Sequence, residues 1–185
     1  MNTNKEIPEK NIFKAYDIRG VVGKSLNDRS IIQIGKSIGS EALQKKQSNM
    51  CLGYDGRLSS PHIYNLLSKA LISTGINVIN IGLVTTPMLY FSTHQLKTKS
   101  GIMITGSHNP PEYNGFKIVI DEKTLSADDI QSLYQRIIKK EFLIGEGEIS
   151  NINIKSSYLE RIYSDIKLAR PIRIAIDCGN GSAGI

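Results

Sequence analysis

Short apolar runs that favour β-strands alternate along this chain with amphipathic segments that favour helices, and this alternation restricts the fold more than any other feature. Runs typical of buried strands occur at residues 50–54, 77–81, 101–104 and 116–120. Strands separated by single helices form βαβ units, whose parallel strands lie between layers of helices. We therefore predict an α/β fold with a mixed, mostly parallel, four-stranded sheet between helices.

Helical segments are recognised by apolar residues that recur three and four positions apart. This pattern marks residues 30–43, 61–71, 86–95, 126–138 and 155–168. Residues 144–153 lose the pattern and are predicted to be a linker, whereas residues 172–177 are predicted to form a further strand that ends in a turn. We expect one α/β domain at 1–153, and at 154–185 a linker helix and the first strand of an incomplete second α/β domain.

Composition and charge exclude several classes of protein. The net charge is +6, from 23 basic and 17 acidic residues, but the basic residues are scattered, which indicates a solvated surface rather than a nucleic-acid interface. No stretch approaches the roughly 20 apolar residues that cross a membrane, and the polar N-terminus lacks the apolar core of a secretory signal. We predict a cytoplasmic protein that binds neither nucleic acid nor membrane. Cys51 and Cys178 lie in apolar runs and are both predicted to be buried.

The segment 105–117, TGSHNPPEYNGFK, joins two of the predicted strands. Loops at strand ends are the usual ligand-binding positions of α/β proteins. Gly106 leaves room for a ligand beside Ser107, and two prolines and an Asn-Gly pair stiffen the rest of the loop. The sequence thus presents a serine hydroxyl on a braced loop.

A serine hydroxyl needs a base or a cation to react. His108 is adjacent to Ser107, but neighbouring side chains in an extended loop often diverge, and the G-x-S-x-G pattern of many hydrolases is absent. The alternative is a serine that carries a phosphoryl group, which requires nearby cations such as Lys117 and Arg19.

Simpler interpretations of these residues also stand. Ser107 could be a surface serine, His108 could brace the loop, Lys117 could be solvated and Arg19 could form a structural ion pair with Asp17. The residues at positions 55 and 57, an aspartate and an arginine before a helix, are predicted to be mainly structural and to position the loop.

Four segments together resemble the α-D-phosphohexomutase family, in particular its phosphomannomutase/phosphoglucomutase branch. TGSHNPPEYNGFKIV resembles the active-site loop of that family, and NIFKAYDIRGVVG resembles its N-terminal signature. GYDGRLSSP resembles its G-x-D-x-R-x-S segment, and IAIDCGNGSAG resembles the opening strand and turn of its second domain. The resemblance covers nearly the whole chain and implies the fold of the family's first domain.

The resemblance implies that Ser107 is phosphorylated and exchanges its phosphoryl group with hexose 1- and 6-phosphates of mannose or glucose through a hexose bisphosphate. It implies that Tyr16 and Arg19 bind substrate, and that His108 and Lys117 serve proton transfer and charge stabilisation. It also implies Mg²⁺, bound by the phosphoserine oxygen of Ser107 and by three aspartates, with hexose 1,6-bisphosphate as activator.

The aspartate loop of that metal site, of the form DGDxDR, is not in this sequence. We therefore expect the chain to be the N-terminal part of a phosphotransferase and to be inactive alone. Two alternatives stay open: a truncated product without turnover, and a noncatalytic module that binds sugar phosphates. Neither the oligomeric state nor the preferred sugar follows from the sequence.

Overall fold

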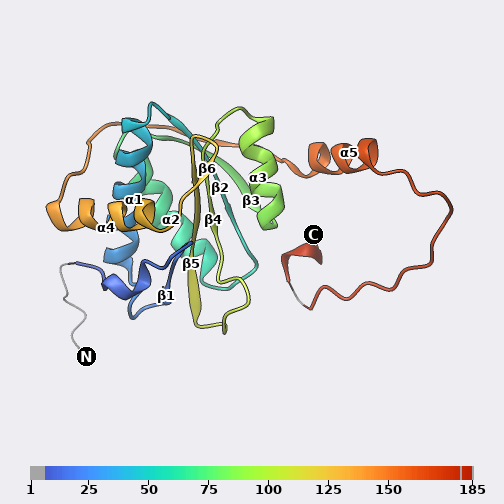
Figure 1. Cartoon of the computed structure of the whole chain (residues 1–185), viewed down its shortest axis with the longest axis horizontal. Coiled ribbons are helices and arrows are strands. Elements are labelled where there is room, and N and C mark those ends of the chain that lie inside the picture. The colour runs from blue at the N-terminus through green and yellow to red at the C-terminus, as the bar shows by residue number, and fades with distance from the viewer. Residues whose placement is uncertain (1–6, 180, 185) are drawn as a thin grey trace.

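The computed structural model describes residues 7–179 and 181–184, which form a sheet covered by helices on both faces (Figure 1). The strands are β1 (Ile18–Val21), β2 (Asn49–Tyr54), β3 (Asn77–Leu83), β4 (Gly101–Ile104), β5 (Tyr113–Ile120), β6 (Lys123–Thr124) and β7 (Ile149–Asn151). The α-helices are α1 (Asp28–Gln44), α2 (Ser60–Ile72), α3 (Thr86–Gln95), α4 (Asp128–Lys139) and α5 (Lys155–Asp165), and two short 3₁₀ helices are η1 (Lys10–Ile12) and η2 (Ser182–Gly184). None of these described helices is long and apolar enough to cross a lipid bilayer.

The sheet is mixed, with the strand order β1-β5-β4-β2-β3-β7 and with β6 paired to β5. β2 runs parallel to β3 and β4, and β3 runs parallel to β7, whereas β1, β4 and β6 are antiparallel to β5. The α/β class is confirmed, and the four predicted strands correspond to β2, β3, β4 and β5. The sheet has seven strands rather than the four predicted. The sequence pattern did not indicate β1, β6 and β7, because these short, polar or glycine-containing segments lack the apolar run of a buried strand.

Helix α1 shows how the local sequence produces these elements. Asn27 precedes the helix in an extended conformation, and its side-chain oxygen accepts a hydrogen bond from the Ser30 N–H at 3.0 Å. This contact satisfies one of the free donors in the first helical turn. Behind it, Ile31, Ile34 and Ile38 form a buried stripe, and burial of each side chain contributes roughly 1.5–3 kcal/mol to folding.

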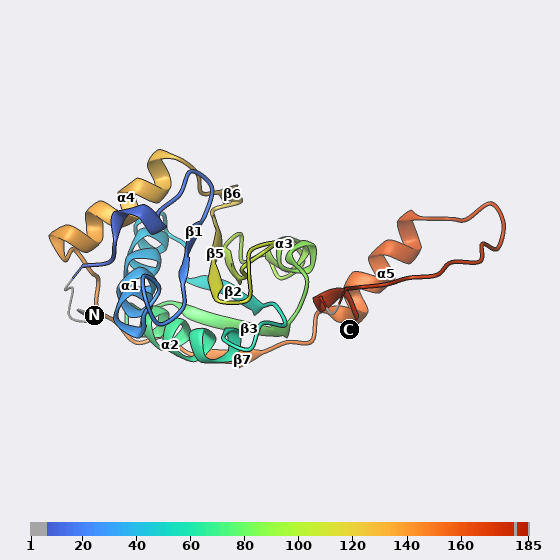
Figure 2. The ribbon, with the colours of Figure 1, turned by 90° about the horizontal axis from the view of Figure 1, so that it is seen from below.

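Two apolar clusters, one on each face, hold the sheet between its helices. Helices α1, α2 and α4 pack on one face (Figure 2), where the larger cluster includes Ile38, Leu67 and Leu133. Helix α3 packs on the other face, where Leu89 and Met103 belong to the smaller cluster. The connection from β2 to β3 through α2 and the connection from β3 to β4 through α3 therefore run on opposite faces of the sheet.

The predicted linker at residues 144–153 is only partly a linker. Its residues Ile149–Asn151 form β7, which pairs with β3 and extends the sheet by one strand. Ile154 follows β7 and is buried in the cluster under α3. This strand is exposed along its whole length, so its sequence carries no alternation of buried and exposed residues, and only the free edge of β3 explains its formation.

The strand predicted at residues 172–177 is absent from the described chain. These residues are extended but exposed, and none of them pairs with a neighbouring strand. An apolar run forms a stable strand only when backbone partners are available, and the described residues offer none here. Cys178 is therefore exposed, which corrects the prediction of burial, whereas Cys51 is buried as predicted.

Candidate active site

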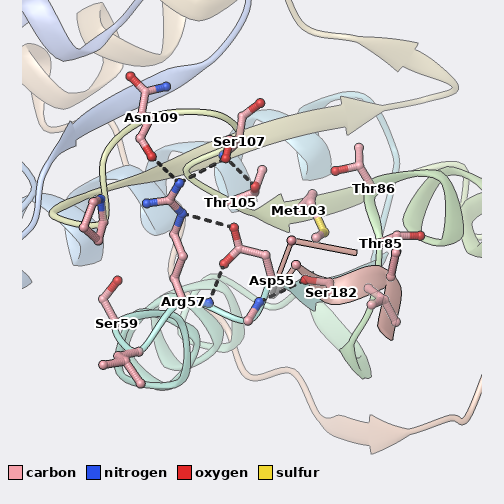
Figure 3. A pocket seen from close by; sticks show the side chains of 17 residues that line it. Asp55, Arg57, Ser59, Thr85, Thr86, Met103, Thr105, Ser107, Asn109 and Ser182 are labelled. Carbon is pink, nitrogen blue, oxygen red and sulfur yellow. Dashed lines mark hydrogen bonds and ion pairs between the residues drawn. The ribbon is translucent and has the colours of Figure 1, made fainter. Parts of the chain in front are cut away.

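The carboxyl ends of β2, β3 and β4 lie at one edge of the sheet and line an open cavity of about 750 Å³ (Figure 3). The chain leaves β2 for β3 on one side and returns to β4 on the other, so the strand order reverses at β2. Ligands of open α/β sheets bind in the crevice that such a reversal creates. The lining of this crevice includes Asp55 after β2, Thr85 before α3 and Ser107 after β4.

Ser107 lies on this rim with its side chain exposed. Its backbone has a left-handed conformation with φ of 54°, and its N–H donates a hydrogen bond to Thr105 Oγ1 at 2.9 Å. The Asn109 N–H donates to Gly106 O at 3.1 Å and closes the turn. These backbone contacts leave the Ser107 hydroxyl free to face a ligand.

His108 is the described residue whose side chain contacts the hydroxyl of Ser107. Its Nδ1 lies 3.3 Å from Ser107 Oγ, so the imidazole is close enough to exchange a proton with that oxygen. Within residues 7–179 and 181–184, no carboxylate forms an ion pair with His108. The third member of a Ser-His-Asp arrangement is therefore missing from the described chain, which argues against the hydrolytic alternative.

The other three predicted site residues line a second cavity of about 780 Å³ on the far side of the loop. Tyr16 and Arg19 reach it from the N-terminal segment and β1, and Lys117 reaches it from β5. Arg19 is opposite Gly115 in the β1–β5 ladder, and Lys117 is two residues beyond Gly115, so both cations project from the same face of the sheet.

Within this second cavity, Arg19 is paired with the carboxylate of Asp17, as one of the simpler interpretations predicted. The Nε atom of Arg19 is nevertheless buried without a hydrogen-bond partner among the described residues. Tyr16 is 74% exposed, and Lys117 is partly buried. The lining of the cavity thus has three basic side chains, because Lys14 joins Arg19 and Lys117, and one carboxylate. This excess of positive charge suits an anionic ligand.

The two cavities adjoin at Asn109, which lines both of them. The structure thus brings Ser107 and His108 together on the loop, and it brings Tyr16, Arg19 and Lys117 together in the neighbouring cavity. No hydrogen bond in the described chain joins Ser107 to Arg19 or Lys117. Asn109 was not among the predicted site residues, although its place in the loop next to His108 could have indicated it.

Arg57 and Asp55 contact the loop directly, as the prediction of a structural role required. The Arg57 guanidinium donates to the carbonyl oxygens of Ser107 and Asn109 at 3.0 and 2.6 Å, and the Gly106 N–H donates to Asp55 Oδ2 at 3.2 Å. The predicted structural contact of both residues with the loop is therefore confirmed.

The described residues do not contain a complete metal site. In residues 7–179 and 181–184, no three His, Cys, Asp or Glu side chains are grouped closely enough to hold an ion. The hydroxyl oxygen of Ser107 is a hard ligand of the kind that Mg²⁺ prefers, but it is one ligand of the several that such an ion needs.

Comparison with known proteins decides the family. The model of the phosphoglucomutase/phosphomannomutase alpha/beta/alpha domain I matches residues 10–143, which is most of the chain. The chain belongs to the phosphoglucomutase/phosphomannomutase family. The resemblance inferred from the four sequence motifs is therefore confirmed, and the matched residues include the loop, the second cavity and all five predicted site residues. The first cavity is lined mainly by matched residues, but Gly179, Gly181, Ser182 and Ala183 from the end of the chain also line it.

Individual members of the phosphoglucomutase/phosphomannomutase family are similar over almost the whole chain. The phosphomannomutase/phosphoglucomutase of Pseudomonas aeruginosa is 45% identical over 174 residues, and the phosphoglucomutase of Neisseria gonorrhoeae is 46% identical over 177 residues. These matches cover 94% and 95% of this chain but only 38% of each relative. A crystal structure of a family member from Burkholderia thailandensis superposes with a TM-score of 0.91 at 39% identity, over 96% of this chain and 41% of that one.

Proposed function

We propose that this chain supplies the phosphoryl-carrying serine of an intramolecular phosphotransferase that interconverts hexose 1-phosphates and 6-phosphates of mannose or glucose. The observation that carries the proposal is the exposed hydroxyl of Ser107, held on a braced loop at the crevice where the strand order reverses. The family supports the chemistry, since the relatives are named as phosphomannomutases and phosphoglucomutases.

In the proposed reaction, phosphorylated Ser107 transfers its phosphoryl group to the free 1- or 6-hydroxyl of a hexose monophosphate. The bond from the serine oxygen to phosphorus breaks and a bond from the sugar oxygen to phosphorus forms, which gives a hexose 1,6-bisphosphate and a free serine. The bisphosphate then reorients and returns its other phosphoryl group to Ser107, so hexose bisphosphate also serves as the activator that loads the free serine.

Each neighbouring side chain has a proposed part in this exchange. His108, with Nδ1 at 3.3 Å from Ser107 Oγ, accepts and returns the proton of the serine hydroxyl. Lys117 and Arg19 provide positive charge for the transferring phosphoryl group and for the second phosphate of the sugar. Tyr16, exposed at the mouth of the second cavity, contacts the sugar.

We further propose that Mg²⁺ is bound at Ser107, where it would neutralise charge on the phosphoryl oxygens. Ser107 supplies one oxygen ligand, and the described residues do not supply the rest. The 185-residue chain by itself is therefore expected to show no multiple-turnover activity. We also propose the cytoplasm as its location.

Labelling with a hexose bisphosphate tests the proposal. Full-length protein incubated with glucose 1,6-bisphosphate is expected to gain one phosphoryl group on Ser107, as measured by phosphopeptide mass spectrometry. Ser107→Ala should abolish this label, whereas Ser59→Ala, which alters another serine of the same cavity, should retain it. Label that persists in Ser107→Ala would overturn the proposal. Unchanged sugar-phosphate binding together with no phosphoserine in the wild type would indicate the noncatalytic module instead.

A further inference from the structure

The guanidinium of Arg57 lies against the backbone of the serine loop and bonds four of its carbonyl oxygens. The bonds to Ser107 and Asn109 are drawn in Figure 3. Nη1 donates to Pro110 O at 2.7 Å and to Tyr113 O at 3.0 Å. Nη2 donates to Ser107 O at 3.0 Å and to Asn109 O at 2.6 Å. One side chain from the end of β2 thus gathers the carbonyl groups of a loop that is about 50 residues away in sequence.

We propose that Arg57 is a positioning residue for phosphoryl transfer, and that its planar set of donors fixes the direction of the Ser107 hydroxyl. This inference rests on the proposed function of Ser107. It goes beyond a bracing role, because it predicts that the rate of phosphoryl transfer depends on the shape of the guanidinium and not only on its positive charge.

The donors of Arg57 show why it does not act as a substrate-binding residue. A guanidinium has five N–H groups. Four of them donate hydrogen bonds to loop carbonyl oxygens. The fifth, on Nε, faces the carboxylate of Asp55 at 3.4 Å. No donor remains for a sugar phosphate, so the contribution of Arg57 must pass through the loop.

Asp55 anchors this arrangement to the rest of the fold. Its Oδ2 accepts the Gly106 N–H at 3.2 Å, and its Oδ1 accepts the Arg57 N–H at 3.1 Å and the Ser60 Oγ–H at 2.7 Å. The carboxylate therefore connects the serine loop to the end of β2 and to the first residue of α2. Both connected elements are rigid, which suits a group that must hold another group in place.

Gly106 fits the flat face of the guanidinium. A Cβ atom at this position would overlap Arg57 Cζ and Nε, so only glycine allows the guanidinium to lie so close to the loop. The next residue, Ser107, has a φ of 54°, a conformation that costs an L-residue about 1–2 kcal/mol. Such strain persists only where surrounding contacts determine the backbone, and Arg57 and Asp55 provide those contacts.

A lysine at position 57 cannot make the same set of hydrogen bonds. Its ammonium is a point charge with three donors and no planar fork, so Arg57→Lys would keep the positive charge beside Asp55 but would release most of the four carbonyls. A displacement of about 1 Å at a reacting group can lower a rate by about 100-fold. We therefore expect Arg57→Lys to transfer phosphate almost as slowly as Arg57→Ala.

The first experiment measures single-turnover transfer from glucose 1,6-bisphosphate to Ser107 in the full-length protein. Arg57→Lys and Arg57→Ala should each slow the transfer by about 100-fold, while the KM for hexose 1-phosphate changes by less than about threefold, because Arg57 contacts no substrate. Arg136→Ala is the matched control. Arg136 is, like Arg57, a partly buried arginine with several acceptors. It joins Glu41 and Gln44 of α1 to α4, so its loss should leave the transfer rate unchanged.

Gly106→Ala tests the same contact with Arg57 in place, since the new methyl group would displace the guanidinium. It should slow transfer as much as Arg57→Ala, and the double variant should be no slower than either single variant, because both changes break one contact. This variant also keeps the inference testable if Arg57→Ala fails to fold. Wild-type transfer rates in Arg57→Lys or Gly106→Ala, or additive losses in the double variant, would overturn the inference.

Hydrogen exchange separates this inference from the proposed function. The loop amides of Gly106, Ser107 and Asn109 are hydrogen-bonded, and they should exchange faster in Arg57→Lys but not in Arg136→Ala. If the wild-type protein accepts no phosphate, the proposed function fails. The hydrogen-exchange rates of the loop amides still show whether Arg57 holds the loop. Unchanged exchange in Arg57→Lys would refute the positioning role whatever the activity.

Discussion

At the residue scale, each of three residues at this site provides a different chemical feature. Ser107 contributes an exposed hydroxyl, whereas Gly106 contributes the absence of a side chain and Arg57 contributes a planar group of donors. A change at any of the three affects the others, because the hydroxyl is directed by the backbone and the backbone is held by the arginine.

Gly115 lies at a close approach between β1 and β5. A Cβ atom here would overlap the carbonyl oxygen of Ile18, so Gly115→Ala must push the two strands apart. We expect it to lower the free energy of unfolding by about 1–3 kcal/mol, the usual effect of overpacking, as measured by urea denaturation. The control is Gly56→Ala, whose added methyl group would meet only Ser182 Oγ at 3.8 Å; an equal loss there would contradict the steric explanation.

Cys51 and Cys178 should differ sharply in reactivity. Burial raises the pKa of the Cys51 thiol, so it stays neutral and covered, whereas Cys178 is exposed. In the native 185-residue chain, Ellman's reagent should label one thiol rapidly, and Cys178→Ser should remove that fast reaction. Rapid labelling of the Cys178→Ser variant would show that Cys51 is accessible.

The raised pKa of Cys51 also has a consequence for stability. An unfolded thiol ionises near pH 8.5, while the folded thiol is still neutral. The stability from the neutral buried thiol is therefore fully present below that pH, and it is lost as the pH rises through the folded pKa. Cys51→Ala should show a smaller loss of stability between pH 8 and pH 10 than the wild type in urea titrations.

At the scale of elements, the order of strands and the placement of helices create the crevice. β2 lies between β3 and β4. Helix α2, which connects β2 to β3, and helix α3, which connects β3 to β4, lie on opposite faces of the sheet. The residues after β2 and β4 therefore meet at one edge, which explains how Asp55 contacts Gly106. The G-x-D-x-R motif at the end of a predicted strand indicated that Asp55 supports a loop. The motif did not indicate that the Gly106 N–H is the group that Asp55 binds.

The first turn of α4 offers an element-scale test. Ala127 precedes this helix with a φ of 41° and provides no side-chain cap, so acidic residues must stabilise the helix start. A hydrogen bond from Lys123 lowers the pKa of the Asp129 carboxyl, and Lys123 Nζ lies 2.9 Å from Asp129 Oδ2. Asp129→Asn should lower the free energy of unfolding at pH 7 by about 0.3–1 kcal/mol.

The pH dependence of this loss follows from the lowered pKa. The contribution of Asp129 is present above its unfolded pKa of about 3.9, and it disappears as the pH falls through the lower folded pKa. The stabilities of wild type and Asp129→Asn should therefore converge in thermal denaturation as the pH falls below that unfolded pKa and through the lower folded one. Asp128→Asn, an exposed neighbour in the same turn, is the control for the general effect of helix-start charge.

At the scale of the whole molecule, the described chain consists of a packed sheet with an appended C-terminal part. Helix α5 has no buried residue and projects away from the sheet (Figure 1). Its half-buried Tyr158 makes an edge-to-face contact with Phe91 of α3, with ring centroids 5.3 Å apart. Among the described residues, Ile154 is the last buried one along the chain, and the division predicted between residues 153 and 154 stays a prediction that truncation can test.

Two truncations provide that test. A chain that ends at residue 154 should lose only about 1 kcal/mol, mainly the aromatic contact of Tyr158. A chain that ends at residue 143 also loses β7 and Ile154, and removal of one buried isoleucine alone costs roughly 2–5 kcal/mol. We expect the shorter chain to unfold at clearly lower urea and to self-associate through the free edge of β3, as measured by denaturation and light scattering. Equal stability of the two chains would place the boundary before β7.

The sequence by itself determined the α/β class, the five helices, the four central strands and the serine loop, because burial along one element appears as a local periodicity. It did not determine β7, the exposure of Cys178 or the separation of the site into two cavities. Nor did it show that Arg57 bonds four carbonyl groups of the loop. Only the tertiary structure decided these features, because each depends on which distant segments meet at a sheet edge, and no local pattern records such a meeting.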